Sequence, residues 1–131
     1  MDEINKILKI TAEKLKNSYS KYSNFSVAAA ILGENGKWYY GVNVENRSYG
    51  LTICAERSAA VSAVTDGVKE FKKIIVISES KELITPCGAC REFLAEFCSK
   101  DSEILLGNSS EIKFRGKFLE LLPMRFILDG V

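Results

Sequence analysis

Residues 72–80, KKIIVISES, place the strongest limit on the fold of this chain. At their centre, residues 74–77 form an unbroken apolar run that is rich in β-branched side chains. Such a run is typical of a strand in the middle of a sheet, because none of its positions alternates toward solvent. The run therefore predicts a sheet that lies between two layers of other structure.

Patterns on either side of this run predict further strands. FSVAAAIL (25–32) and KWYYGVNV (37–44) are predicted to be two strands joined at an Asn35-Gly36 hairpin signal. EILLG and IKFRGKF, between residues 103 and 118, are predicted to be two more. With the apolar run, they give a mixed sheet of about five strands.

Three helices are expected around this sheet. The apolar residues of 3–16 recur at helical spacing. A second helix is predicted to begin near Cys54 with Thr52 as its N-cap, and a third with Thr85 as N-cap and Pro86 as first helical residue. The order α-β-β-α-β-α-β-β then indicates an α/β fold, a three-layer α/β/α sandwich with a β-α-β crossover in the middle of the sheet.

The composition favours one ordinary globular domain. The chain has 131 residues, of which 47% are hydrophobic and 27% charged, so a single domain over 1–131 is expected. A net charge of +1 gives no field that would recruit nucleic acid or anionic lipid, and we expect neither as a partner. The N-terminal sequence lacks a long apolar run with a cleavage site, which predicts a cytoplasmic protein.

The absence of histidine narrows the chemistry. It excludes a histidine-based triad and a histidine-ligated metal, so a general base must be Glu, Asp, Lys, Tyr or Cys. The four cysteines are Cys54, Cys87, Cys90 and Cys98. In a reducing cytosol, such clustering indicates a metal site or catalysis more than disulfides.

Three of these cysteines lie at predicted helix starts. Cys87 and Cys90 form a CxxC pair on one helical face, and a β-α-β fold can bring Cys54 to the same edge of the sheet. Three thiolates leave one position of a tetrahedral zinc ion open, as in catalytic sites, and helix N-termini favour the thiolate form. Cys98 would lie roughly 12 Å from Cys90 along a continuous helix, so it is predicted to be a buried or free thiol.

The residues that follow Cys54 supply the remaining chemistry. Glu56 is predicted to take a proton from a zinc-activated water and to return it to a substrate nitrogen or leaving amine. This requires Cys54 and Glu56 to lean past the helix N-terminus together, since residues two apart in a regular helix point to different sides. Arg57 is predicted to hydrogen-bond the sulfurs and to offset the net negative charge of three thiolates on a divalent ion.

Each of these features has a simpler interpretation when taken alone. The CxxC pair also fits a redox motif or half of a structural zinc knuckle. Glu56 also fits a partner of the helix dipole, and Arg57 an ordinary surface ion pair. Together, CAE and the later PCGAC, with Pro86 before the first cysteine of the pair, favour a catalytic zinc site.

CAE and PCGAC resemble the two zinc motifs of the cytidine deaminase superfamily, in the branch where cysteine replaces histidine as first ligand. Four longer segments are similar to the homotetrameric cytidine deaminases of pyrimidine salvage. They are NVENRSYGLTICAER (43–57), YSKYSNF, PCGACREFLAEF and the LLPxxF ending. The resemblance runs from about Ser18 to Phe126. It implies a cytidine deaminase-like fold and the zinc-dependent hydrolysis of cytidine and 2'-deoxycytidine to uridine and 2'-deoxyuridine, with release of ammonia.

The resemblance also implies a role for each matching residue. Zinc would be held by Cys54, Cys87 and Cys90, with Glu56 as the proton carrier. The substrate contacts would be Asn43 and Glu45 on the ribose hydroxyls, Phe25 on the base, Ala55, and Phe126 from a neighbouring subunit, with Tyr49 at the subunit contact. The active unit would be a homotetramer with shared sites. From the residues alone, Phe25 and Phe126 also fit core positions, and Asn43 and Glu45 also fit a strand end.

The chain departs from the family pattern in two places. It has Phe25-Ser26-Val27-Ala28 where FPVG is common, and Cys90-Arg91-Glu92 where CRQ is frequent. Ser26 should relax the backbone, and Ala28 adds a methyl group. A serine there is also found in the similar blasticidin S deaminases. Two alternatives therefore stay open, namely a deaminase of a modified cytosine nucleoside such as blasticidin S and a non-catalytic structural zinc module, although the NVEN and SYG segments favour cytidine.

Overall fold

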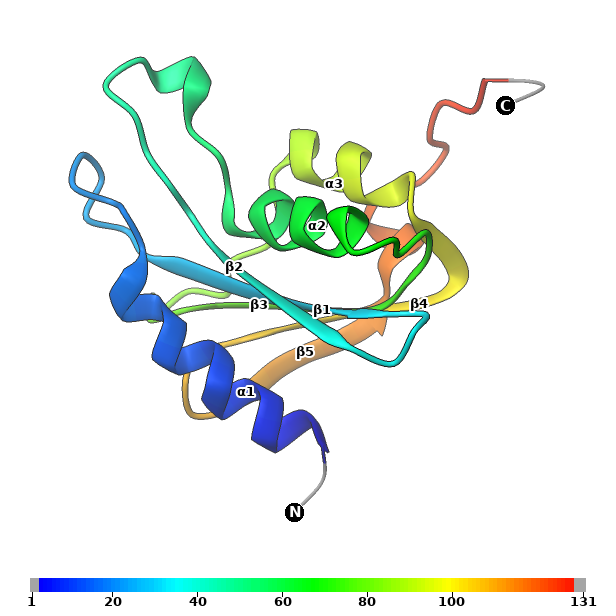
Figure 1. The fold of residues 1–131 in the computed structure, drawn as a ribbon, viewed down its shortest axis with the longest axis horizontal. Coiled ribbons are helices and arrows are strands. Elements are labelled where there is room, and N and C mark those ends of the chain that lie inside the picture. Colours follow the sequence, from blue (N-terminus) through cyan, green and yellow to red (C-terminus); the bar gives the residue numbers. More distant parts are fainter. Residues whose placement is uncertain (1–2, 129–131) are drawn as a thin grey trace.

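The computed structural model describes residues 3–128 (Figure 1). Its main elements are α1 (Glu3–Lys14), β1 (Val27–Gly33), β2 (Trp38–Val42), α2 (Ala55–Thr65), β3 (Phe71–Ser78), α3 (Gly88–Ala95), β4 (Cys98–Gly107) and β5 (Ile112–Lys117). Three short 3-10 turns join them, η1 (Leu15–Asn17), η2 (Tyr49–Leu51) and η3 (Phe118–Leu121). The predicted order of helices and strands is confirmed. None of the helices within this range is long and apolar enough to cross a membrane.

The strands form one mixed sheet in the order β2-β1-β3-β4-β5. All neighbouring pairs are antiparallel except β3 and β4, which are parallel and connected through α3. The apolar run of β3 lies at the centre of the sheet and is buried, as predicted. This β3-α3-β4 crossover fixes the side of the sheet on which α3 lies.

Helices cover both faces of the sheet, which confirms the three-layer prediction. Figure 1 shows α1 on one face, with α2 and α3 side by side on the other. The strand period of two separates the two cores. Ala28 and Ala30 of β1 pack in the cluster that contains α1, whereas Ala29 and Ile31 pack in the cluster that contains α2 and α3.

Helix α2 lies unusually close to the sheet. A Cβ atom placed on Gly41 of β2 would come within 2.6 Å of the Ala55 carbonyl oxygen and 2.9 Å of the Ala59 Cα atom. The helix residues Ala55, Ala59 and Ala63 are all fully buried. Small residues on both sides therefore determine how near the start of α2 comes to the strands.

Both helices on this face begin later than predicted. Cys54, and not Thr52, is the N-cap residue of α2, because Thr52 is instead the C-cap residue of η2 and its N–H donates to the Tyr49 carbonyl oxygen. In α3 the N-cap residue is Cys87, and not Thr85. Cysteines thus occupy both N-cap positions.

The predicted position of Cys98 in a continuous helix is wrong. Helix α3 ends at Ala95, and Cys98 is the first residue of β4, where it pairs with Phe71 of β3. The Cys98 thiol is free, as predicted, and partly buried. Burial raises the pKa of this thiol to about 12, so it stays protonated at neutral pH.

We predict that Gly41→Ala destabilises the protein by about 1–3 kcal/mol, because the new methyl group overlaps the backbone of α2. Urea denaturation measures this change. Gly50→Ala is the matched control, since a Cβ atom at Gly50 meets nothing within 4 Å. A Gly41→Ala protein as stable as the control would contradict the close packing of α2.

Candidate metal and catalytic site

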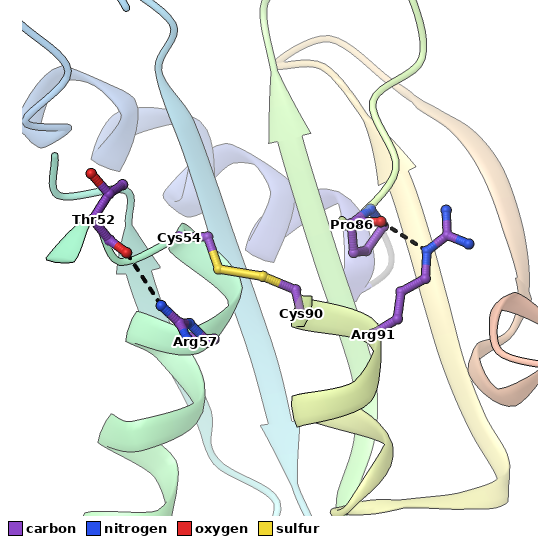
Figure 2. Close-up of a disulfide and its surroundings, with 6 residues drawn as sticks. All are labelled: Thr52, Cys54, Arg57, Pro86, Cys90 and Arg91. Atoms are coloured by element: carbon purple, nitrogen blue, oxygen red, sulfur yellow. Dashed lines mark hydrogen bonds between the residues drawn. A yellow bond between two sulfur atoms is a disulfide. The ribbon is translucent and has the colours of Figure 1, made fainter. Parts of the chain in front are cut away.

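The starts of α2 and α3 form a common site on one face of the sheet. The loop before α2 is closed at its base by Val44 and Ile53, whose backbones exchange hydrogen bonds of 2.8 and 2.9 Å. Cys54 follows directly, so its position is tied to the end of β2. Cys90 lies in the first turn of α3, and Figure 2 shows the two cysteine side chains extending toward each other.

The Cys54 and Cys90 sulfurs are joined as a disulfide in the structure (Figure 2). The Cα atoms of the two residues are 7.6 Å apart, which exceeds the roughly 4.4–6.8 Å of ordinary disulfides. Two thiolates that share a zinc ion, each about 2.3 Å from it, tolerate a wider spacing. The backbone spacing therefore fits a shared metal ion better than a covalent bridge.

Glu56 joins this pair of cysteines. The sulfurs of Cys54 and Cys90 and a carboxylate oxygen of Glu56 all lie within 4.8 Å of one another. The predicted difficulty of the two-residue spacing is resolved because Cys54 has an extended backbone and lies before the helix. Cys54 and Glu56 can therefore both reach the space beyond the helix N-terminus.

The Glu56 carboxyl group is almost completely buried, with 5% of the residue exposed. Burial raises its pKa above the ordinary value, whereas the hydrogen bond from its own N–H and the nearby charge of Arg57 act in the opposite direction. A raised pKa makes the carboxylate a stronger base toward a nearby proton donor. This is the property that acid–base catalysis requires.

Cys87 lies outside this group of ligand atoms. It is an exposed free thiol at the N-cap of α3, and its sulfur caps no backbone N–H. The structure thus brings two of the three predicted zinc ligands together, with the third at the start of the same helix as Cys90.

Arg57 lies in the first turn of α2 but does not hydrogen-bond the sulfurs in the structure. Its Nη2 atom donates to the Thr52 carbonyl oxygen at 3.2 Å (Figure 2). Its Nε–H is buried and has no acceptor. The guanidinium group therefore carries one buried donor without a partner at the start of α2.

Asn43 lies directly after β2 and is buried. Its Nδ2 atom donates to the Phe25 carbonyl oxygen at 2.8 Å, and its Oδ1 atom accepts from the Val27 N–H at 3.0 Å and from the Ser18 hydroxyl. Asn43 thus connects the end of β2 to the segment that carries Phe25.

Glu45 binds the same segment. Its carboxylate accepts hydrogen bonds from the N–H groups of Tyr22 and Ser23, each at 3.1 Å, and a short one from the Ser23 hydroxyl. The Ser23 hydroxyl, with the two N–H groups, lowers the pKa of this carboxyl group. Ser23 had no role predicted from the sequence, although it lies in the YSKYSNF segment, because this contact joins residues far apart in the chain.

The remaining predicted substrate residues differ in exposure. Ala55 is fully buried between Cys54 and Glu56, and Phe25 is 37% exposed. Tyr49 is 79% exposed on the projecting 44–53 loop, and Phe126 is 75% exposed in the segment that follows η3. Within the described chain, Tyr49 and Phe126 are therefore not core residues.

Comparison with known proteins agrees with this site. The family described as "Cytidine and deoxycytidylate deaminase zinc-binding region" matches residues 1–106. A cytidine deaminase of Sporosarcina psychrophila is 41% identical over 95% of this chain and 91% of its own, and a probable cytidine deaminase of Dictyostelium discoideum is 44% identical over 95% and 84%. A blasticidin-S deaminase of Bacillus cereus is 27% identical over 92% of this chain and 89% of its own.

Comparison with solved structures supports the same family. The crystal structure of a cytidine deaminase from Burkholderia pseudomallei superposes with a TM-score of 0.84 and 38% identity, covering 96% of this chain and all of that one. The matched family region includes Cys54, Glu56, Cys87 and Cys90. The chain therefore belongs to the cytidine and deoxycytidylate deaminase family, whose zinc-binding region contains the site at the starts of α2 and α3.

Proposed function

We propose that this chain is a zinc-dependent hydrolase that converts cytidine and 2'-deoxycytidine, as free nucleosides, to uridine and 2'-deoxyuridine with release of ammonia. The observation that carries the proposal is the group formed by Cys54, Glu56 and Cys90, whose ligand atoms lie within 4.8 Å of one another. A role in pyrimidine salvage in the cytoplasm, by one domain over 1–131, is part of the proposal.

The proposed zinc ligands are Cys54, Cys87 and Cys90. Cys54 and Cys87 occupy N-cap positions, and Cys90 lies in the first turn of α3, so all three are near the positive end of a helix dipole. The Cys87 side chain has to turn toward the other two sulfurs, and no capping hydrogen bond opposes that rotation. When bound, zinc supplies the Lewis acidity that makes a water molecule nucleophilic near neutral pH.

Glu56 is the proposed proton carrier. A Glu56 carboxylate oxygen accepts a proton from the attacking water and delivers it to the base nitrogen. It then takes a second proton from the new hydroxyl group at C4 and delivers it to the leaving amine. Its burial keeps bulk water from competing and raises its pKa toward the working pH. Arg57 holds a positive charge beside the thiolates, and its unpaired Nε–H is available to a sulfur.

Asn43 and Glu45 are the proposed partners of the ribose hydroxyl groups. Glu45 lines a hollow of about 310 Å³ together with Tyr49, which supports a place for the sugar there. In the free chain both side chains bind the 18–27 segment, so that segment is held in a fixed position before the substrate arrives. Phe25, at the exposed part of the same segment, is proposed to pack on the base, and Ala55 to line the site beside Glu56.

A homotetramer with shared sites is the proposed assembly. Large apolar side chains are exposed on the loop that projects in Figure 1, including Tyr49 and Leu51. Others are exposed after η3, namely Met124, Phe126, Ile127 and Leu128. Clusters of this kind mark interaction surfaces on soluble proteins. Phe126 is proposed to reach the site of a neighbouring subunit, with Tyr49 at the contact.

We predict that the protein denatured with chelator, and without reductant, presents all four cysteines as free thiols. If Cys54 and Cys90 are zinc ligands, neither is oxidised in the native protein. Titration with a chromogenic thiol reagent counts them. A count of two, leaving only Cys87 and Cys98 reactive, would show that the Cys54–Cys90 pair is a disulfide and not part of a metal site.

We predict that Glu56→Gln retains zinc but lowers kcat for cytidine by about 10²–10⁴-fold, because the amide cannot carry the proton. Zinc content is measured by atomic absorption and turnover by the ultraviolet change on uridine formation. Glu92→Gln, at an exposed position of α3, is the control and should behave like the unmodified protein.

Two outcomes of that assay would favour the alternatives. A zinc-loaded protein that turns over blasticidin S but not cytidine would favour the modified-nucleoside deaminase. A protein that binds zinc but turns over neither compound, with or without Glu56→Gln, would favour the structural zinc module, in which the metal only stabilises the fold.

We predict that sedimentation equilibrium gives a species of four chains and that Phe126→Ala lowers kcat/KM for cytidine by about tenfold, as expected for the loss of an aromatic contact. Phe114→Ala is the control, because this phenylalanine is 39% exposed on β5. A fully active monomer would refute the shared site.

A further inference from the structure

One arginine at the start of α3 makes hydrogen bonds in three directions. The Arg91 Nε atom donates to the Pro86 carbonyl oxygen at 2.8 Å, which Figure 2 shows as a dashed line. Its Nη1 atom donates to the Leu121 carbonyl oxygen at 3.0 Å, and its Nη2 atom to the Thr85 hydroxyl at 3.1 Å. Each of the three guanidinium nitrogens thus donates a hydrogen bond. In the sequence, Arg91 stood out only as part of a family motif.

These bonds hold the backbone on both sides of Cys87. The Pro86 carbonyl belongs to the peptide group whose nitrogen is that of Cys87, and Pro86 itself is buried. On the other side, the Arg91 N–H donates to the Cys87 carbonyl oxygen at 2.9 Å. The same residue therefore fixes the peptide group before Cys87 through its side chain and the one after it through its backbone.

The hydrogen bond to the Leu121 carbonyl oxygen connects this arrangement to a fixed part of the fold. Leu121 is the last residue of η3, and η3 is anchored by Phe118, which is fully buried in the same core cluster as α2 and α3. Arg91 thus connects the segment that carries Cys87 to the core through an element far along the chain. The 79–87 segment contains no helix or strand of its own to serve this purpose.

We infer that Arg91 is a positioning residue for the metal site: its guanidinium group holds the backbone of Cys87 where rotation of one side chain completes the set of three thiolates. The inference rests on the proposed function, because it takes Cys87 as a zinc ligand. Cys90 lies inside α3 and is positioned by the helix itself. Cys87 is at the helix boundary, where other contacts have to fix the backbone.

A lysine cannot replace this arginine. The three acceptors lie in different directions, and the planar guanidinium group presents donors from three nitrogens in a fixed arrangement. A lysine ammonium group is a single nitrogen at the end of a flexible chain. Arg91→Lys therefore keeps the positive charge but removes the three hydrogen bonds of the guanidinium group. The variant thus distinguishes a role in positioning Cys87 from a role in charge compensation.

The test compares zinc retention in Arg91→Lys with that in Arg115→Lys, an arginine of the edge strand β5 that pairs with Glu103. We expect Arg91→Lys to lose zinc to an excess of chelator about 10–100-fold faster than the unmodified protein, as is typical when an outer-shell partner is removed. Arg115→Lys should release zinc at the unmodified rate. In the cobalt(II)-substituted protein, the thiolate charge-transfer band should weaken in Arg91→Lys, since its intensity reports the number of sulfur ligands.

A purely structural role for Arg91 predicts a different result. It would lower the melting temperature of the metal-free protein but leave the rate of zinc release and the cobalt spectrum unchanged, and that result would overturn the inference. If Arg91→Lys does not fold, Thr85→Val removes only one of the three bonds, and a several-fold faster release is then expected. Unchanged release in Thr85→Val would count against the inference.

Cys87→Ser separates this inference from the function on which it rests. If Cys87→Ser retains zinc as well as the unmodified protein, Cys87 is not a ligand, and the proposed ligand set fails together with the role of Arg91. If Cys87→Ser loses zinc rapidly while Arg91→Lys does not, the ligand set stands and only the positioning role is wrong.

Discussion

The contact between Gly41 and the backbone of α2 is the constraint on which the site depends. Because a side chain at this position would overlap Ala55 and Ala59, the helix lies against β2 at backbone contact distance. The same contact places the first turn of α2, with Glu56, beside the start of α3. A displaced α2 would separate Cys54 from Cys90, although none of the residues that make the packing contact is itself a metal ligand.

The electrostatic arrangement of the site follows from this packing. Two helix N-termini bring partial positive charge to a place where two cysteine sulfurs and one carboxyl group gather. Burial opposes the charged form of Glu56 more strongly than Arg57 favours it, so the pKa of this carboxyl group is raised. The hydrogen bonds of Arg91 add no chemistry of their own, but they fix Cys87, the cysteine at the N-cap of α3.

The fold could be predicted from the sequence because its signals are local. The apolar run of β3, the Asn35-Gly36 hairpin and the amphipathic pattern of α1 each indicated the correct element. The wrong position of Cys98 has a tertiary cause, since residues after Ala95 leave the helix to pair with Phe71 of β3. Contacts such as those of Glu45 with Ser23, and of Arg91 with η3, join distant parts of the chain, and no spacing in the sequence predicts them.

We expect three thiolates to hold one zinc ion and to leave one position open for chemistry. Zinc X-ray absorption spectroscopy on the purified, metal-loaded protein tests it most directly. The expected spectrum shows three sulfur ligands at about 2.3 Å and one lighter ligand. Four sulfur ligands would contradict it, because Cys98 would then close a structural site. Two sulfur ligands would contradict it as well, because Cys87 would then lie outside the metal shell.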